Sequence, residues 1–246
     1  MAEGPRSDGT ARRIERRTRC LATQPSKSDA GLLHARGGTA IRPTCAIDAH
    51  PLTMSKPLVL ASTSAYRASL LRRIAADFTQ EAPQCDERPL AGETVAVQAR
   101  RLAATKASSV AARYTDALVL GSDQLAALDG RPVGKPGSHA AAVDQLRAAS
   151  GRTLEFHTAW CLVDAVSGRR WSGCDLTRVL FRGLDDACIE RYLSREKPYD
   201  CAGSFKSEGL GIALFEHIES TDPTALIGLP LIAVAAALRD AGMSVP

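Results

Sequence analysis

Aromatic residues are scarce in this chain, at 4% of its 246 residues, so we expect a core built from aliphatic side chains and alanine. Long apolar runs are missing as well, because no stretch approaches the ~18 residues that a membrane-spanning helix needs. The apolar segment 229–238 is too short for a span and predicts a helix packed on a sheet. Since 45% of the residues are hydrophobic, the chain can bury a sizeable core, and we expect a globular protein without a membrane partner.

The cysteines lack the arrangement of a disulfide framework or a zinc site. They are odd in number, scattered, and include no Cys-x-x-Cys pair: Cys20, Cys45, Cys85, Cys161, Cys174, Cys188 and Cys201. His139 and His157 have no partner His or Cys at ligand spacing, so we expect both to be structural or exposed. Free cysteines favour a reducing compartment, and we expect a cytoplasmic protein.

The larger part of the chain also lacks an excess of either charge. Residues 1–53 carry nine Lys or Arg and five Asp or Glu, whereas residues 54–246 carry 22 of each sign, so the net charge of +4 belongs to the leader. An electrostatic footprint for nucleic acid is therefore missing from residues 54–246. We do not expect nucleic acid as a partner.

Residues 1–55 form a basic leader with no sustained hydrophobic period. Three interpretations stay open: a disordered tail, a targeting peptide, or sequence ahead of a true start at Met54. The leader lacks the apolar region of a secretory signal, and its composition predicts disorder. We expect residues 56–246 to form a single domain, with a nucleic-acid-binding arm in the leader as a further alternative.

Short apolar runs alternate with helical patterns after Met54, which predicts an α/β domain with a mixed sheet. The expected strands are 58–61, 78–82, 117–121, 153–166, 171–181 and 210–218, and the expected helices are 66–76, 94–114, 138–149, 185–195 and 230–241. A Ser167-Gly168 turn predicts that two of these strands form an antiparallel hairpin.

Residues 117–124, Ala-Leu-Val-Leu-Gly-Ser-Asp-Gln, are the most informative stretch. We expect a buried strand that stops at Gly121 and presents Asp123 at the carboxyl edge of the sheet, where open α/β sheets bind ligands. A carboxylate there can accept a proton from water or bind a hard divalent cation. The alternative is an Asp that only caps a turn or helix.

Two further pieces suit a phosphate ligand. Ser62-Thr63-Ser64-Ala65-Tyr66-Arg67 follows the first strand and leads into a helical pattern, so hydroxyls, backbone N–H groups and an arginine gather there. The alternative is that Ser64 merely caps the helix and Arg67 is solvated. The third piece, Gly134-Lys135-Pro136, holds a lysine on a turn.

In this order and spacing the three pieces resemble the Maf family of nucleoside triphosphate pyrophosphatases, which shows Ser-x-Ser-Pro-x-Arg, Gly-x-Asp and Gly-Lys-Pro. Here Ala65 replaces the proline. The likeness covers residues 56–242 and continues through Asp86-Glu87, Lys106, Ser150-Gly151, Phe181-Arg182, 200–209 and 226–231. It implies a Maf/ITPase-like α/β fold, with an elongated mixed sheet flanked by helices and an active-site cleft between two lobes. A homodimer is also compatible with this resemblance.

The resemblance implies roles in cutting a nucleoside triphosphate between its α and β phosphates. Asp123 is expected to take the proton of the attacking water, and Glu87 and Asp123 to hold a divalent cation, Mg²⁺ or Mn²⁺. The expected phosphate ligands are Ser62, Ser64, Arg67, Lys106 and Lys135. From the residues alone, a solvated helix face is the alternative for Lys106, and an exposed acidic turn is the alternative for Glu87.

Tyr66, Gln124 and Glu208 are expected to set base specificity. Other Maf branches carry an additional Arg at position 66 and a Thr at 124, and the combination found here is similar to the branch that acts on 7-methyl-GTP. Methylation at N7 makes guanine cationic, an aromatic face attracts a cation, and a carboxylate accepts from the N1 and exocyclic donors. The expected products are the monophosphate and pyrophosphate.

Rival interpretations remain. One is a dTTP or UTP pyrophosphatase of the same family, and another is a non-catalytic, nucleotide-binding regulator of septum formation. A serine hydrolase is excluded because Ser204 lacks a His–Asp context. Cys201 is expected to be a small buried residue.

Overall fold

The computed structural model describes residues 56–246, so the predictions for residues 1–55 lie outside the described part. The strands are β1 (Leu58–Ala61), β2 (Thr79–Glu81), β3 (Leu118–Leu128), β4 (Arg131–Val133), β5 (Thr153–Asp164), β6 (Arg170–Phe181) and β7 (Phe215–Glu219). The helices are α1 (Ala65–Leu71), α2 (Val95–Ala111), α3 (His139–Ala149), α4 (Asp186–Glu196) and α5 (Leu231–Asp240). Three short 3₁₀ turns complete the described chain: Ala202–Ser204, Leu210–Leu214 and Ala225–Ile227.

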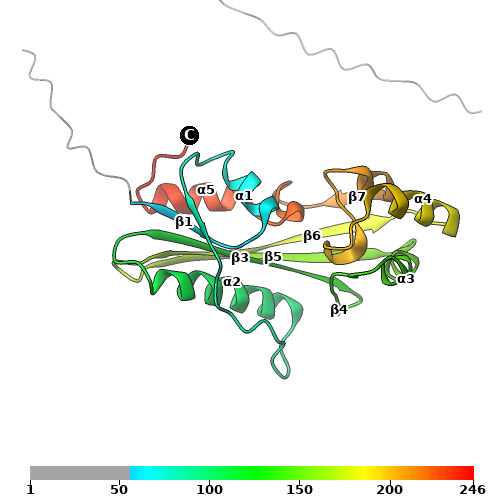
Figure 1. Ribbon diagram of the computed structural model, residues 1–246, viewed down its shortest axis with the longest axis horizontal. Helices are drawn as coiled ribbons and strands as arrows, with labels where there is room; N and C mark the ends of the chain where they lie inside the picture. Colours follow the sequence, from blue (N-terminus) through cyan, green and yellow to red (C-terminus); the bar gives the residue numbers. More distant parts are fainter. Residues whose placement is uncertain (1–55) are drawn as a thin grey trace, which may run out of the picture. The chain divides into compact units, whose positions relative to one another are not determined.

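The strands form one mixed sheet in the order β2-β1-β3-β5-β6-β7, with β4 paired to β3. Strand β1 runs parallel to β2 and β3, whereas β3, β5, β6 and β7 pair antiparallel in turn. The predicted hairpin is confirmed as β5 and β6. The predicted fold class, a mixed sheet flanked by helices, is also confirmed (Figure 1).

Strand β3 is where the prediction from the sequence was wrong. It does not stop at Gly121 but continues to Leu128, so Asp123 and Gln124 lie inside the strand. The cause is pairing: β5 lies alongside the whole length of β3, from Leu118↔Asp164 to Leu128↔Leu154. Backbone hydrogen bonds to β5 therefore keep residues 122–128 extended. The apolar pattern of the sequence alone predicts that the strand ends at Gly121.

Smaller differences concern the ends of elements. Helix α1 ends at Leu71, whereas the pattern predicts a helix to residue 76, and residues 210–214 form a 3₁₀ turn before β7 begins. Strand β4 is an unpredicted element. Its signal was present as Asp129-Gly130, whose positive φ angles of 49° and 76° match the two-residue hairpin turn that Asp-Gly favours.

The position of the site is set by a stretch of β3 that has no neighbouring strand on one edge within the described chain. Strand β1 pairs with residues 118–121 of β3, and β4 pairs with residues 126–128. Within the described chain no strand lies along that edge at residues 122–125. The carboxyl end of β1 therefore opens onto an uncovered stretch of β3, which contains Asp123 and Gln124.

The helices cover the sheet in groups. Figure 1 shows α1 and α5 over one face, α2 under the other, and α3 and α4 near the far end of the long strands. The buried side chains follow this division, since α1 and α5 share one apolar cluster with β1 and β3, and α3 and α4 share another around Phe156 and Phe181. Side chains cap four helix starts: Ser64, Thr94, Ser138 and Asp185.

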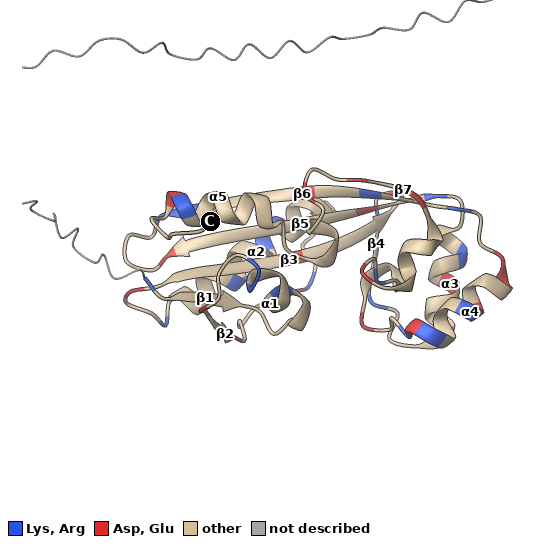
Figure 2. Cartoon of the chain, turned by 90° about the horizontal axis from the view of Figure 1, so that it is seen from above, with Lys and Arg blue, Asp and Glu red and all other residues tan. Residues whose placement is uncertain are grey.

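None of the helices within residues 56–246 has the length and apolar character to cross a bilayer. Positions occupied by Lys or Arg are interspersed with positions occupied by Asp or Glu along α3 and α4, as the colouring of Figure 2 shows. This mixture agrees with the balanced charge of residues 54–246.

Candidate active site

All ten predicted site residues line one cavity of about 750 Å³. That volume lies within the range typical of small-molecule sites. The lining comes from the segment after β1, from the loop after β2, from α2 and β3, from the turn after β4, and from residues 200–208 and 226–228. The tertiary structure thus brings together residues that are up to 146 positions apart, from Ser62 to Glu208.

The centre of the cavity is a lysine shared by two carboxylates. Lys106 Nζ lies 2.6 Å from Asp123 Oδ1 and 2.6 Å from Glu87 Oε1. Lys106 and Asp123 are buried, whereas the Glu87 side chain is 64% exposed. The hydrogen bond from Lys106 holds the pKa of Glu87 below its usual range. The alternative of a solvated helix face for Lys106 is therefore wrong, because α2 turns this position toward the sheet.

A glycine allows α2 to deliver that lysine. A Cβ atom at Gly121 would lie 2.4 Å from the Ala103 carbonyl oxygen and 2.5 Å from the Ala107 nitrogen, both in the backbone of α2. Only a residue without a Cβ lets the helix approach β3 this closely. Lys106 projects from the same turn of α2, one residue before Ala107.

Helix α2 also holds the loop that carries Glu87. Buried Gln98 donates from Nε2 to the Glu87 carbonyl oxygen at 3.2 Å. Arg101 donates to the Arg88 carbonyl and pairs with Glu93 at 2.7 Å. The helix therefore positions both Glu87 and its lysine partner.

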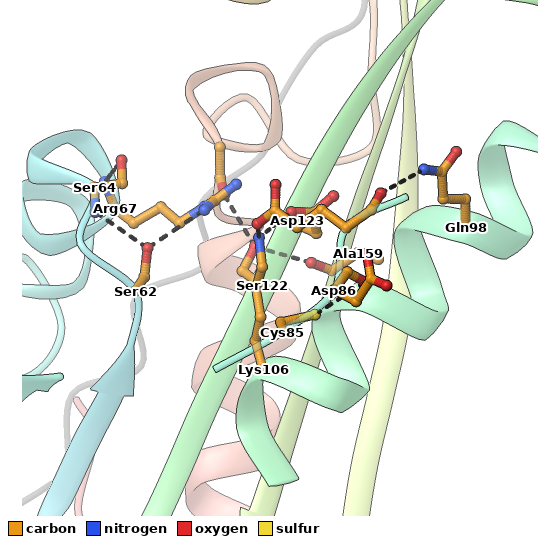
Figure 3. A network of polar contacts seen from close by, with 12 residues as sticks. Ser62, Ser64, Arg67, Cys85, Asp86, Gln98, Lys106, Ser122, Asp123 and Ala159 are labelled. Carbon is orange, nitrogen blue, oxygen red and sulfur yellow. Dashed lines mark hydrogen bonds and ion pairs between the residues drawn. The ribbon is translucent and has the colours of Figure 1, made fainter. Parts of the chain in front are cut away.

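Arg67 enters the cavity from α1. Its Nε donates to the Gly228 carbonyl at 3.0 Å and its Nη1 donates to Ser62 Oγ at 3.3 Å. Figure 3 shows the guanidinium extending from α1 toward Asp123 and Lys106. Burial lowers the pKa of Arg67, while the charges of Asp123 and Glu87 oppose that shift. The alternative of a solvated Arg67 is wrong.

Ser62 and Ser64 shape the turn between β1 and α1. The Ser64 N–H donates to Ser62 Oγ at 3.2 Å, and Ser64 Oγ accepts from the Arg67 N–H at 3.4 Å. Ser64 is thus the N-cap of α1 as well as a cavity residue. Lys135 is exposed on the turn after β4, at the rim, where its charge helps to lower the pKa of Glu87.

The three residues predicted to set base specificity also line the cavity, with Tyr66 next to Arg67 and Gln124 next to Asp123 in the chain. Tyr66 is half-buried and Glu208 is exposed, and both line the cavity. Burial raises the pKa of Tyr66. Gln124 Nε2 donates to Thr158 Oγ1 at 2.9 Å and to the carbonyls of Ala225 and Leu226 at 3.0 Å each.

Lys206 is a cavity residue that the sequence reasoning missed as a site residue. It lines the wall beside Tyr66, and Asp200 Oδ1 lies 4.0 Å from its Nζ. Although burial alone would lower it, the pKa of Lys206 is raised through its hydrogen bond with Tyr66 and the charges of Tyr66 and Asp200. The sequence did contain a signal for this residue, because Lys206 stands two positions before Glu208 in the segment 200–209 that carries part of the family resemblance.

Cys201 departs from its prediction. It is half-buried and lines the cavity together with Asp200 and Ala202. Burial raises the pKa of its thiol to about 11, so the thiolate is a minor form at neutral pH. His139 agrees with its prediction, since it is exposed and contacts Tyr199 and Glu190.

The free carboxylate oxygens fit a divalent cation. Among residues 56–246, Asp123 Oδ2 is buried and has no hydrogen-bond partner, and Glu87 contacts the same Lys106 ammonium as Asp123 Oδ1. In residues 56–246 no cluster of three His, Cys, Asp or Glu could hold a metal. Mg²⁺ in proteins is usually bound by one or two carboxylates, and water and phosphate oxygens fill its remaining coordination positions.

Several known proteins are similar to this chain over most of its length. A 7-methyl-GTP pyrophosphatase from Xanthomonas oryzae pv. oryzae is 54% identical over 193 residues, which cover 78% of this chain and 100% of that protein. The proteins of the same name from Cupriavidus pinatubonensis and Ralstonia nicotianae are each 53% identical, over 75% and 76% of this chain and 93% and 96% of their own lengths.

The Staphylococcus aureus Ham1 protein aligns with 51% of this chain and 72% of its own, at 18% identity and a TM-score of 0.38. Residues 57–241 match the family described as Maf-like protein. Because this match spans most of the sequence and includes every residue of the cavity, the chain belongs to the Maf-like protein family.

Proposed function

We propose that this protein hydrolyses a modified nucleoside triphosphate, with 7-methyl-GTP preferred, to the monophosphate and pyrophosphate. The observation that carries the proposal is the convergence of Asp123 and Glu87 with Arg67, Lys106 and Lys135 around one cavity. Hydrolysis of a polyphosphate needs a group that accepts a proton from the attacking water. It also needs cations that balance the negative charge of the phosphates.

Asp123 is the proposed proton acceptor. Lys106 occupies Oδ1, which leaves Oδ2 buried and without a partner inside the described chain. Oδ2 can accept a proton from an adjacent water molecule, and this requires that the carboxylate keep a fixed orientation. The contact with Lys106 and the position of Asp123 within β3 hold it.

The cations of the cavity are proposed to bind the phosphates. Arg67 is fixed by Ser62 and Gly228 on one side of its guanidinium, which leaves its remaining N–H groups for a ligand. Its planar fork matches two phosphate oxygens at once. Lys135 stands at the rim and Lys106 at the floor, where it already balances two carboxylates.

Asp123 and Glu87 are proposed to hold Mg²⁺ or Mn²⁺. A divalent cation bound there would neutralise phosphate charge and lower the pKa of a bound water. Lys106 keeps the two carboxylates at equal distances from its Nζ, which prepares them as a pair before any ligand enters.

Base preference is proposed to come from Tyr66, Gln124 and Glu208. A tyrosine face attracts a cationic 7-methylguanine, and Glu208 can accept from its N1 and exocyclic donors. The relatives named 7-methyl-GTP pyrophosphatase are 53–54% identical to this chain over the aligned residues, which supports the same preference here.

Release of pyrophosphate from a nucleotide panel tests the proposal, with Mg²⁺, Mn²⁺ and no added metal. We expect 7-methyl-GTP to be turned over fastest, and Asp123→Asn to lower kcat by at least ~100-fold with the fold preserved. Asp86→Asn is the matched control, because Asp86 is an exposed carboxylate paired with Arg88 outside the cavity lining.

The same measurements separate the rivals. Equal or faster turnover of dTTP would favour the dTTP or UTP enzyme. Nucleotide binding without pyrophosphate release would favour the regulator of septum formation, and Asp123→Asn would then leave the phenotype intact. Salt-dependent DNA binding that disappears when the chain starts at Met54 would favour a nucleic-acid arm.

A further inference from the structure

One ammonium group and one proposed metal ion depend on the same two carboxylates. Lys106 Nζ lies 2.6 Å from Asp123 Oδ1 and 2.6 Å from Glu87 Oε1, so its positive charge already lies between the two acids. Asp123 and Glu87 are also the residues that are proposed to hold a divalent cation. The lysine and the metal therefore compete for the same negative charge.

Burial makes this competition strong. The side chains of Lys106 and Asp123 are each 9% exposed, so little water screens the charges from one another. The position of the lysine is fixed by the backbone of α2, which approaches β3 closely at Gly121. A second cation on the same acids would therefore be repelled by an ammonium that the fold keeps beside them.

The oxygen that is left for a metal belongs to the carboxylate that already holds the lysine. Asp123 Oδ1 accepts a hydrogen bond from Lys106, whereas Oδ2 is buried and has no partner among residues 56–246. A cation at Oδ2 would share this one carboxylate with the ammonium. The lysine thus holds the pair of acids in place and at the same time lowers their attraction for a metal.

The other cations of the cavity act in the same direction. Arg67 and Lys135 also line it, and Figure 3 shows the guanidinium of Arg67 extending toward Asp123. Together with Lys106, three cations face the two carboxylates, an excess of one positive charge before any metal is bound. A triphosphate carries about three to four negative charges and would reverse this excess.

The remaining charged residues of the lining change this balance little. Asp200 and Glu208 are exposed, so water and salt screen their charges. Asp200 also lies 4.0 Å from the ammonium of Lys206, which offsets part of its charge. The buried centre of the cavity therefore depends on a ligand for the negative charge that a metal would need.

Lys106 can also respond directly to a phosphate. An ammonium has three hydrogens to donate, and Asp123 and Glu87 take two of them. The third can be donated to a phosphate oxygen without any movement of the lysine. A bound triphosphate would then offset the charge of the lysine and leave more of the carboxylate charge for a metal.

We infer that Lys106 makes binding of the metal depend on the nucleotide. In the free protein its charge keeps the affinity of Asp123 and Glu87 for a divalent cation low, and a bound triphosphate raises that affinity. This inference rests on the proposed function of the cavity, but it concerns the order in which ligands bind and not the reaction. If Lys106 only stabilised the fold, the metal affinity would not depend on its charge.

Titration of Mn²⁺ into the full chain without nucleotide, followed by calorimetry, tests the inference without depending on turnover. We expect Lys106→Met to bind Mn²⁺ at least ~10-fold more tightly than wild type, because an adjacent positive charge is removed. Adding Asp123→Asn to this variant should abolish the gain. Lys135→Met is the matched control, since it removes the same charge from the exposed rim and should change the affinity by less than ~3-fold.

Thermal unfolding supplies a second measurement in case Lys106→Met is only marginally stable. A metal that binds the folded state raises the melting temperature, so Mn²⁺ should stabilise Lys106→Met and leave wild type nearly unchanged at the same concentration. Wild type should respond to Mn²⁺ once the α,β-methylene analogue of 7-methyl-GTP is bound. This analogue cannot be cleaved between its α and β phosphates, and the comparison needs no variant.

The inference is overturned if wild type without the analogue binds Mn²⁺ as tightly as Lys106→Met does, or if Lys135→Met gains as much affinity as Lys106→Met. It is also overturned if the analogue leaves the response of wild type to Mn²⁺ unchanged. Absence of pyrophosphate release from 7-methyl-GTP, with the expected metal affinities intact, would overturn the proposed reaction and leave this inference standing. Normal release with equal Mn²⁺ affinities would do the opposite.

Discussion

At the scale of single residues, Lys106 shows how one buried charge can organise a site. Its ammonium is 2.6 Å from each of two carboxylates, and its side chain is 9% exposed. Two acids this close would repel each other without a cation between them. The lysine therefore stabilises the arrangement that the proposed chemistry uses.

Replacing that lysine should affect stability and activity together. Lys106→Met leaves Asp123 buried without its counter-charge, so we expect the free energy of unfolding to fall by about 3 kcal/mol and kcat by at least ~100-fold. Urea unfolding and pyrophosphate release measure the two effects. Arg73→Met, a change at an exposed position just after α1, is the control and should alter neither. A Lys106→Met variant with wild-type turnover would contradict the role given to the shared lysine.

At the scale of elements, the contact between α2 and β3 sets the geometry of the cavity. The helix reaches the strand only because Gly121 has no side chain. The same helix carries Lys106 and holds the loop of Glu87 through Gln98. A displacement of α2 therefore moves several parts of the site at once.

Gly121→Ala should separate this helix from the strand. The new methyl group would meet backbone atoms at 2.4 and 2.5 Å, which cannot rotate away. We expect a loss of about 2–3 kcal/mol in unfolding free energy, and turnover lowered more than nucleotide affinity, because Lys106 shifts relative to Asp123. Gly183→Ala is the control, since an added Cβ there meets no atom of the described residues within 4 Å. Equal stability of the two variants would show that α2 adapts freely.

At the scale of the whole described domain, one ion pair joins the entry to β1 with the β5–β6 turn. Lys56 Nζ lies 2.8 Å from Asp164 Oδ1, and Asp164 also accepts from the Val166 N–H and the Ser167 hydroxyl. The hydrogen bond from Lys56 is the largest cause that lowers the pKa of Asp164, from 3.8 to about 2. Since the folded carboxyl binds a proton less readily than the unfolded one, folding is favoured while Asp164 stays ionised.

Acid should therefore remove this contribution. It is fully present above about pH 4 and is lost as the pH falls toward about 2. We expect Asp164→Asn to lower the unfolding free energy by about 1 kcal/mol at pH 7, after allowance for the partly exposed lysine, and the gap to wild type to close by pH 2. Lys56→Met should lose a similar amount and add little to Asp164→Asn. A difference in unfolding free energy between wild type and Asp164→Asn that stays constant with pH would contradict the stabilising role given to the Lys56–Asp164 ion pair.

The sequence by itself determined which residues can do the chemistry and how most of the chain folds locally. Apolar periodicity and capping residues such as Ser138 and Asp185 act over a few positions, so the helices and the β5–β6 hairpin were predictable. The motif residues around Asp123 and Arg67 could be recognised because their order along the chain is specific.

Only the tertiary structure decided where those residues stand. Strand β3 continues through Gly121 because β5 pairs with it, and that pairing joins residues 26 to 46 positions apart, from Leu128↔Leu154 to Leu118↔Asp164, which no local pattern encodes. The burial of Lys106 and the hydrogen bonds of the Gln124 amide depend on atoms brought from α2, β5 and residues 225–226. Each is a contact between distant segments, and such contacts exist only once the chain has folded.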